Sequence, residues 1–399
     1  MSAPSGGLTR SELGVALVAM GVQSVGIIDL VILGPLGPAL VQDFDRDLAW
    51  FASTILAFTV GSAVANVLGA NVVDRFDRKR TLLFVLAGFA AAQAVCALSG
   101  SASGFLAGRV FGGMCAGLFS STVNALVADA VDPSRRGRAN GVVSAAYALA
   151  FIVGVPAGLF LAEAGSWRAP FWSMSALCAL LMVAAAATLR ASVPAPTTAR
   201  SWSALPEVVA DPRRLRSLYV NAALMFSAYA VTPFLADAVV EDLGYQTADL
   251  PGFYLVGGVV TLLAAVATGV YADRKGALAA LRLTVAVSLP GTLYAVVMGN
   301  YGWAATVVGI TAFMAPVTAR TVPANTLAMA AVPERLRGAM MSLTSAFSQL
   351  GLGLGAACAG WVIEAGLPGL PGLAWCGVFS AAVALSAAFL APAPAPAAS

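Results

Sequence analysis

Three charged residues lie clearly within long apolar stretches of this 399-residue chain, away from the ends of these stretches: Asp29, Arg109 and Arg320. If these stretches cross a membrane, each charge costs about 2.5–3.5 kcal/mol at the bilayer centre on insertion scales. Such residues usually face a protein interior or a watery cavity, where they handle ions or substrates. They are therefore the first candidates for chemistry.

Asp29 is the predicted proton site, and Arg109 is the predicted partner that tunes it. Burial favours the neutral form of a carboxyl group and a nearby arginine favours the charged form, so a group subject to both can load and release protons near neutrality. The alternative is a permanent Asp29–Arg109 ion pair that only holds two helices together. The sequence leaves both interpretations open.

Arg320 lies between Pro316 and Pro323. This spacing predicts a break in the helix that frees carbonyl groups to line a cavity. Arg320 then has two possible roles. It either neutralises an anionic group of a substrate or extends its long side chain toward the cytoplasmic surface.

Composition excludes several other chemistries. The absence of histidine rules out imidazole metal sites and His-based catalytic triads. Lys79 and Lys275 each follow an arginine, so neither forms the Gly-Lys-Ser/Thr of a Walker A site. The five cysteines lie in apolar runs at no metal-ligand spacing, and we expect all of them in the core. We expect no metal, no cofactor and no enzymatic reaction, so any coupling must use an ion gradient.

The elements that hold these residues are predicted to be membrane helices. Hydrophobic residues make up 59% of the chain and charged residues 10%, against about 45–50% and about 25% in soluble domains. The 22 basic and 19 acidic residues nearly balance, which gives no sign of a nucleic-acid partner. We therefore expect an all-α integral membrane protein.

Charged or Pro/Gly-rich breaks divide the chain into twelve stretches long enough to span a bilayer. The first apolar run is about thirty residues long, which is too long for a cleavable signal peptide, so it should remain as a span. Residues 1–10 form a cytoplasmic N-terminus, 190–216 a cytoplasmic linker with one short helix around Leu205 to Ala210, and 391–399 a disordered cytoplasmic tail. The predicted spans are 11–41, 48–73, 81–99, 103–130, 139–164 and 170–189 in an N-terminal bundle (11–189), and 217–240, 251–272, 279–299, 303–332, 339–363 and 373–390 in a C-terminal bundle (217–390).

Basic residues predict the orientation. Eighteen of the 22 Lys and Arg fall in loops on one side, and only Arg46 and Arg168 fall on the other. Because cytoplasmic loops collect Lys and Arg, both termini are expected in the cytoplasm. The predicted location is a bacterial-type inner membrane, with multiple spans.

The two halves repeat. Asp74 and Asp273 end corresponding helices 199 residues apart, and each is followed by arginine. Glu163 and Glu364 each begin a Glu-Ala-Gly sequence, 201 residues apart. Matches at nearly one offset indicate a six-plus-six duplication, and hence two pseudo-symmetric six-helix bundles.

Two such bundles, with basic loops after the second and eighth helices, resemble the major facilitator superfamily over nearly the whole chain. That family's loop pattern G-x-x-x-D-R-x-G-R-R is met in the second half at Gly269, Asp273, Arg274 and Gly276. The first half matches it at Asp74, Arg75, Lys79 and Arg80, with Ala70 and Asp77 where glycines are usual.

Three further features are similar to the twelve-helix drug:proton antiporters and arabinose-efflux-like exporters of that superfamily. Asp29 is followed five residues later by Gly, as in the first helix of those exporters. Arg109 begins an R-x-x-x-G motif in the fourth helix. The fifth helix carries an antiporter-like motif at Gly154, Pro156 and Gly158. Close helix packing is the alternative explanation of that glycine cluster.

The resemblance also implies roles for the basic loops and for the central helices. The loops act as a cytoplasmic latch favouring the outward-open state, which here comprises Asp74, Arg75, Arg80, Asp129, Asp273 and Arg274, with Asp129 joining Arg75 or Arg80. The predicted substrate cavity comprises Gln23, Asn124, Phe226, Tyr229, Tyr254, Phe313, Arg320, Asn325, Phe347 and Gln349. Ordinary packing is an equal explanation for most of these. Aromatic walls with few charges suit an amphipathic or lipophilic solute better than a sugar.

These features predict a secondary active transporter, most directly a proton-coupled exporter that works by alternating access. The alternatives are a proton-coupled importer or uniporter, and a non-transporting receptor or scaffold that keeps the carrier fold. The expected partners are a small-molecule substrate, protons and the lipid bilayer. We expect the protein to act as a monomer.

Overall fold

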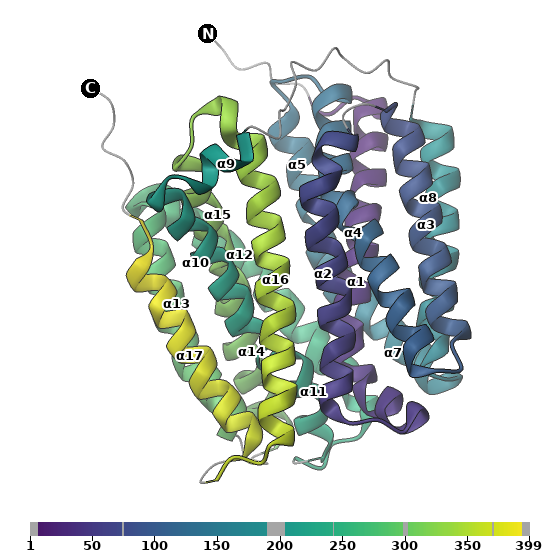
Figure 1. Ribbon diagram of the computed structural model, residues 1–399, viewed down its shortest axis with the longest axis vertical. Helices are drawn as coiled ribbons and strands as arrows, with labels where there is room; N and C mark the ends of the chain where they lie inside the picture. The colour runs from purple at the N-terminus through teal and green to yellow at the C-terminus, as the bar shows by residue number, and fades with distance from the viewer. Residues whose placement is uncertain are drawn as a thin grey trace.

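Twelve helices in the computed structural model are long and apolar enough to cross a membrane, which confirms the predicted all-α fold (Figure 1). The structure describes residues 7–73, 76–189, 204–241, 243–297, 302–368 and 371–392. The first span begins, and the last span ends, at the same end of the bundle, as an even number of spans requires (Figure 1). We call this the terminal end, and the other the distal end.

The first six spans occupy the N-terminal half. They are α1 (Arg10–Phe44), α2 (Leu48–Val73), α3 (Arg78–Leu98), α4 (Ala102–Ala130), a fifth span in four pieces, and α8 (Arg168–Thr188). The pieces of the fifth span are α5 (Arg136–Ser144), α6 (Ala146–Leu149), the π-helical segment η1 (Ala150–Gly154) and α7 (Val155–Ala164).

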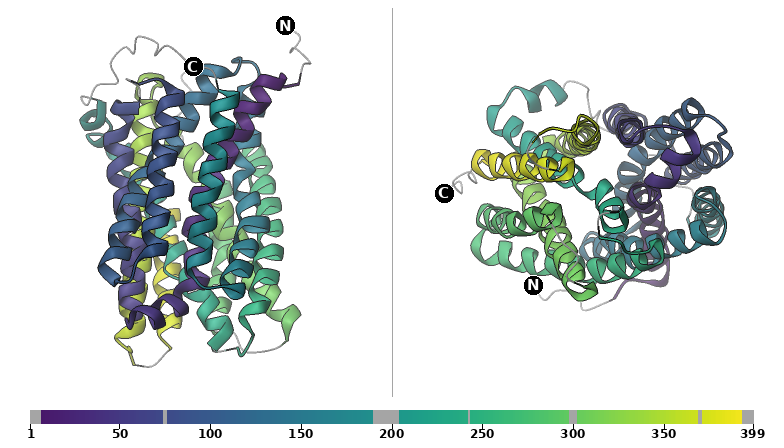
Figure 2. Two further views of the ribbon diagram at one scale, coloured as in Figure 1. Left: turned by 90° about the vertical axis from the view of Figure 1, so that its right-hand side faces the viewer. Right: turned by 90° about the horizontal axis from the view of Figure 1, so that it is seen from below.

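The other six spans form the C-terminal half, which lies beside the first in the view along the helix axes (Figure 2). They are α10 (Pro212–Tyr229) with α11 (Thr232–Glu241), α12 (Leu250–Lys275) after the short η2 (Thr247–Asp249), α13 (Ala277–Val297), α14 (Trp303–Ala319) with α15 (Thr321–Ala330), α16 (Arg337–Glu364) after η3 (Glu334–Leu336), and α17 (Gly372–Leu390). A short helix, α9 (Ala204–Val209), lies where the sequence predicted one.

Local capping sets several helix ends. Thr9 and Glu12 form a capping box that starts α1. Asp211 accepts from the backbone N–H of Arg213, and Pro212 occupies the first turn, so the seventh span begins at Pro212 rather than at the predicted residue 217. The sequence-based boundary was late because it followed hydropathy and not the cap.

Helix α9 is fastened to the C-terminal half by one ion pair. Arg335 Nη1 lies 2.7 Å from a carboxylate oxygen of Glu207, and this hydrogen bond holds the pKa of Glu207 below its usual range. Val208, beside it, is fully buried. The helix is therefore packed on the bundle.

Pro156 explains the π-helical part of the fifth span. It lacks an N–H and its ring displaces the carbonyl one turn earlier, and the chain there adopts π-helical geometry. A Cβ on Gly154 would overlap Ile28, and one on Gly158 would overlap Ile32. The glycines of this motif thus let α1 approach the irregular segment closely.

Small residues also bring α2 against α4. A Cβ on Gly113 would overlap the backbone of Phe58, and one on Gly117 would overlap that of Ser62. In the other half, Gly351 and Gly355 of α16 meet the backbone of α10 in the same way. Close backbone approach over glycines spaced four apart is a common packing mode in lipid, where van der Waals contact rather than the hydrophobic effect holds helices together.

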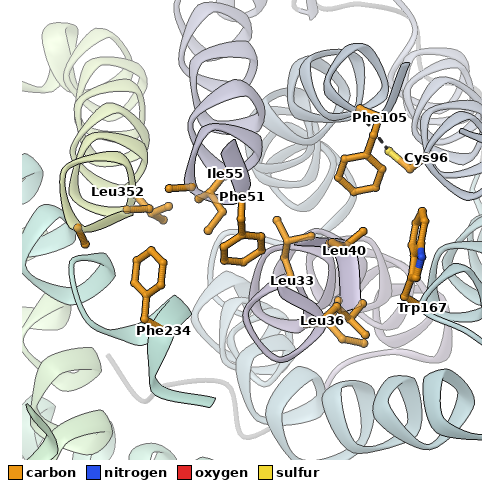
Figure 3. Packing of buried hydrophobic residues seen from close by; sticks show 14 of the residues in the cluster. Leu33, Leu36, Leu40, Phe51, Ile55, Cys96, Phe105, Trp167, Phe234 and Leu352 are labelled. Atoms are coloured by element: carbon orange, nitrogen blue, oxygen red, sulfur yellow. Dashed lines mark hydrogen bonds between the residues drawn. The ribbon is translucent and has the colours of Figure 1, made fainter. Parts of the chain in front are cut away.

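The two halves meet through α2 with α16, α1 with α11, and α7 with α12. One apolar cluster crosses between them near the distal end, with Leu33, Leu36 and Phe51 from the first half and Phe234 and Leu352 from the second (Figure 3). The rings of Phe51 and Phe234 are 6.1 Å apart in an edge-to-face arrangement. Glu364, at the end of α16, accepts from the backbone N–H of Ala49 at the start of α2 at 3.3 Å. The distal parts of the halves are therefore in direct contact.

Cysteine placement requires one correction. Cys96, Cys115, Cys178 and Cys376 are buried as expected, but Cys358 is exposed on α16. The outer face of a membrane helix contacts lipid and is as apolar as its inner face, so an apolar run does not identify a core position.

We expect Gly113→Ala to destabilise the fold, because the new methyl group must displace the backbone of Phe58. Overpacking of this kind costs about 1–3 kcal/mol. The matched control is Gly141→Ala in α5, where a Cβ meets nothing within 4 Å. Thermal unfolding in detergent should show a lower midpoint for Gly113→Ala only. Equal midpoints for the two variants would contradict the close packing of α2 on α4.

Candidate functional site

Asp29 and Arg109 form an ion pair in the interior of the N-terminal half. Nη1 of Arg109 lies 2.8 Å from both carboxylate oxygens of Asp29. The exposed fractions of the two side chains are 0% and 1%. The structure therefore brings the two residues together as the sequence predicted, on α1 and α4.

Two residues that the sequence analysis missed complete this cluster. Nε2 of Gln93, on α3, donates to Asp29 Oδ1 at 3.0 Å. The guanidinium of Arg109 lies over the ring of Phe58, on α2, at 4.4 Å from the centroid, which is within the range of a cation–π contact. A glutamine in the apolar run of the third span was the available signal for Gln93. The sequence contained no signal for Phe58, because nothing distinguishes one phenylalanine from the many other apolar residues of the second span.

The cluster has hydrogen-bonding capacity to spare. Among the described residues, Nε and Nη2 of Arg109 and Oε1 of Gln93 are buried and have no hydrogen-bond partner. Leaving a buried donor or acceptor unpaired costs about 1–3 kcal/mol. The cluster is therefore a costly polar centre, and its geometry could accommodate a different set of hydrogen bonds.

Arg320 lies at the break between α14 and α15, which confirms the break predicted from its prolines. Its Nη2 donates to the carbonyl oxygen of Leu224 at 2.9 Å and to Ser227 Oγ at 3.0 Å. Nη1 lies 3.5 Å from Ser288 Oγ. The side chain is 1% exposed and does not extend to the surface, so the alternative in which it reaches the cytoplasm was wrong.

The two arginines occupy related places in the two halves. Arg109 joins the fourth span to the first and lies near Gln93 of the third. Arg320 joins the tenth span to the seventh and approaches Ser288 of the ninth. The partner of Arg109 is a carboxylate, whereas Arg320 bonds hydroxyl and carbonyl oxygens. Of these two clusters, only the first contains an acid that can exchange a proton.

The predicted cavity residues lie in different surroundings. Tyr254 lines a small apolar cavity with Phe253, Ile310 and Met314, and Phe313 is fully buried. Gln23 is half-buried and hydrogen-bonds Ser120 at 3.3 Å. The half-buried members are Phe226, Tyr229, Phe347 and Gln349, and the exposed members are Asn124 and Asn325.

A larger cavity of about 420 Å³ lies between the halves near the distal end. Its walls include Leu36, Leu159 and Trp167 from the first half and Gln246 and Thr247 from the second. Glu163, of the repeated Glu-Ala-Gly sequence, also lines it. None of the predicted cavity residues is among its lining residues.

The latch prediction is corrected in one pairing. Asp129 accepts from Nε of Arg78 at 3.0 Å, and not from Arg80, which is the described one of the two arginines predicted to join it. Arg78 opens α3 beside the end of α4 and is largely buried, whereas Arg80 is exposed. The predicted latch residues Asp74 and Arg75 lie outside the described residues. Asp273 and Arg274 are exposed in the last turn of α12.

Sequence comparison identifies the family. Residues 17–356 match the family model described as Major Facilitator Superfamily. An uncharacterized MFS-type transporter of Bacillus subtilis is 34% identical over 155 residues, which cover 39% of this chain and 37% of the relative. A chloramphenicol resistance protein of Streptomyces lividans is 27% identical over 266 residues, covering 65% of this chain and 67% of the relative. A multidrug resistance protein of Bacillus subtilis is 28% identical over 169 residues, covering 42% of each chain. The chain thus spans less than half the length of the first and third of these relatives.

Solved structures share the fold at low sequence identity. A bacterial homologue of the human lysosomal transporter Spinster, in an inward-facing and occupied conformation, superposes with a TM-score of 0.75 at 17% identity, covering 96% of this chain and 97% of that one. A D-xylose-proton symporter superposes with a TM-score of 0.74 at 16% identity, covering 96% and 98%. With a family model matched over most of its length and a twelve-span transporter fold, the chain belongs to the Major Facilitator Superfamily, whose members are transporters and not enzymes.

Proposed function

We propose that this transporter is a proton-coupled exporter of a small amphipathic or lipophilic solute. The observation that carries the proposal is the buried Asp29–Arg109 pair, in which Nε and Nη2 of Arg109 have no hydrogen-bond partner among the described residues. An ionisable residue inside a membrane bundle is a functional candidate by default, because it is costly to keep there. The names of two relatives, a chloramphenicol resistance protein and a multidrug resistance protein, favour export of such solutes.

The pair offers a simple coupling step. Ionised Asp29 holds Arg109 through Nη1, and protonation of the carboxylate removes that attraction. Because the two residues lie on different helices, the change alters the contact between α1 and α4. One proton moving down 100 mV and one pH unit supplies about 2.3 plus about 1.4 kcal/mol, which supports a solute gradient of several hundredfold.

The second candidate is a proton-coupled importer or a uniporter. It is favoured by the superposition on a D-xylose-proton symporter and on a nucleoside transporter, the latter with a TM-score of 0.75 at 12% identity. The scarcity of charges and the aromatic residues among the candidate cavity positions favour a lipophilic solute over a sugar. The transporter relatives weigh against the non-transporting receptor or scaffold.

The arrangement of the halves is consistent with alternating access. Their distal parts are in contact through Phe51, Phe234 and Glu364. If the termini lie in the cytoplasm of a bacterial-type inner membrane, as the basic loops predict, this is a state closed to the outside. The proposed cytoplasmic latch and the helix-five motif would act in the reverse transition. The latch comprises Asp74, Arg75, Arg80, Asp129, Asp273 and Arg274. A single copy of the chain contains every part that this cycle requires, so we propose a monomer.

Orientation can be tested by cysteine labelling of intact cells. A membrane-impermeant thiol reagent should label single cysteines placed near Asp45 and Ser166. Cysteines near Asp77 and Thr198 should stay protected until the membrane is permeabilised. The variants should be built in a background with the five native cysteines replaced. The opposite labelling pattern would rule out cytoplasmic termini.

The proton role can be tested by proton-gradient-driven flux in proteoliposomes. We expect Asp29→Asn to abolish uphill transport but to keep substrate binding or exchange, because the side chain is fixed in a neutral form. A static pair predicts instead that Asp29→Asn and Arg109→Ala each lose about 3–5 kcal/mol of stability and that the double variant recovers folding and coupling. Full uphill transport by Asp29→Asn would contradict the proposal.

The distal contact predicts an effect of Glu364→Ala on the resting conformation. Asp47 accepts from the N–H of Trp50, so Glu364 supplies the second acceptor at the start of α2 from across the interface. Loss of a helix-capping acceptor costs about 0.5–2 kcal/mol, or roughly two- to thirtyfold in an equilibrium. Labelling of a cysteine at Ala52 from the distal side should rise by this factor. Glu241→Ala, an exposed acid at the same end, should leave it unchanged.

A further inference from the structure

In the Asp29 cluster, only one of the two polar groups of the Gln93 amide has a hydrogen-bond partner among the described residues. Its side chain is 1% exposed, and its Nε2 donates to Asp29 Oδ1 at 3.0 Å. Its Oε1 is buried and has no hydrogen-bond partner among the described residues. The amide thus presents its donor to the carboxylate and keeps its acceptor unused beside it.

The two protonation states of a carboxyl group need different neighbours. An ionised carboxylate only accepts hydrogen bonds, whereas the protonated group has an O–H that must donate. Arg109 has donors only and cannot accept this proton. An amide has both kinds of group, and rotation about its last side-chain bond exchanges them.

Other groups near Asp29 do not supply a strong acceptor. In the described part of the chain, Cys96 of α3 and Cys178 of α8 lie within electrostatic reach of Asp29, as does Arg109 of α4. A thiol is a weak donor and a weak acceptor. On α2, Phe58 presents a ring face to Arg109. Of the side chains hydrogen-bonded to Asp29 in the described part of the chain, Gln93 alone carries an oxygen acceptor.

We propose that Gln93 is a positioning residue that keeps Asp29 hydrogen-bonded in both protonation states, donating through Nε2 to the carboxylate and accepting through Oε1 from the protonated acid. This inference rests on the proposed proton role of Asp29. The switch requires only the rotation of one amide group. The proposal also accounts for Oε1. This oxygen has no partner among the described residues when Asp29 is ionised, and it accepts the hydrogen bond of the carboxylic acid when Asp29 is protonated.

The switch also changes what Arg109 experiences. In the ionised state the guanidinium is held by Asp29 on one side and by Phe58 on the other. When the acid proton is directed to Gln93, Arg109 keeps the ring contact and loses its counter-charge. Gln93 thereby directs the acid proton away from Arg109. Because Gln93 lies on α3, this helix takes part in the proposed coupling.

Infrared difference spectra of the purified full-length protein in liposomes, recorded between alkaline and acidic pH, test this inference. We expect a carboxylic-acid C=O band that appears on acidification and is lost in Asp29→Asn. In Gln93→Met the same band should persist but move toward the frequency of an acid without a hydrogen-bond acceptor. The matched control is Gln23→Met, because Gln23 bonds Ser120 between the same two helices, α1 and α4, away from the pair.

The outcomes separate the two proposals. Absence of any Asp29-dependent band would overturn the proton role itself. An Asp29 band that Gln93→Met leaves in place, or that Gln23→Met moves equally, would overturn the role of Gln93 alone. If Gln93→Met does not fold, glutamine labelled with ¹³C at the side-chain carbonyl gives the answer in otherwise unaltered protein. Its amide band must then change with the Asp29 band and stop changing in Asp29→Asn.

Discussion

The contact between Asp29 and Arg109 constrains how the helices of the N-terminal half can pack. Moving a carboxylate or a guanidinium out of water costs several kcal/mol, and only a close partner with well-placed hydrogen bonds offsets this cost. The partners must therefore be held in place by four helices. The tight packing of α2 on α4 at Gly113 places Phe58 against Arg109, and α3 supplies Gln93. The close apolar packing of these helices therefore holds the polar cluster around Asp29 and Arg109 in place.

The C-terminal half repeats the framework without the acid. Arg320 reaches the seventh and ninth spans as Arg109 reaches the first and approaches the third, but it bonds Leu224, Ser227 and Ser288. Ser227 is in turn tied to Ser380 of α17 through hydroxyl groups 2.9 Å apart. This second centre links four helices with partners that keep the same protonation state at all ordinary pH values. It therefore offers no carboxyl group for the proton coupling that we propose for the N-terminal half.

Hydropathy and repeats predicted the helices because lipid imposes one simple rule. Every backbone N–H and C=O group in the bilayer must be hydrogen-bonded within its own helix, so membrane spans can be recognised from the length and composition of the apolar stretch. The side chains that complete a site obey no such rule. Asp29 and Arg109 were recognisable because charge is rare in a membrane, but Phe58 is one apolar residue among many. The Arg78–Asp129 pair depends on how α3 begins, which no spacing in the sequence specified.

A static ion pair accounts less well than a proton role for the burial of Asp29 and Arg109. Replacing a buried ion pair by apolar residues of similar size is often neutral or stabilising, by up to about 4 kcal/mol. A pair that served only to hold α1 against α4 would therefore be a poor solution. It would be poorer still because Nε and Nη2 of Arg109 have no hydrogen-bond partner in the described part of the chain. Gly154 and Gly158 already let α1 pack closely on the fifth span without any charge. What apolar packing cannot supply is a group that changes its charge inside the bundle, and this is the property that proton coupling needs.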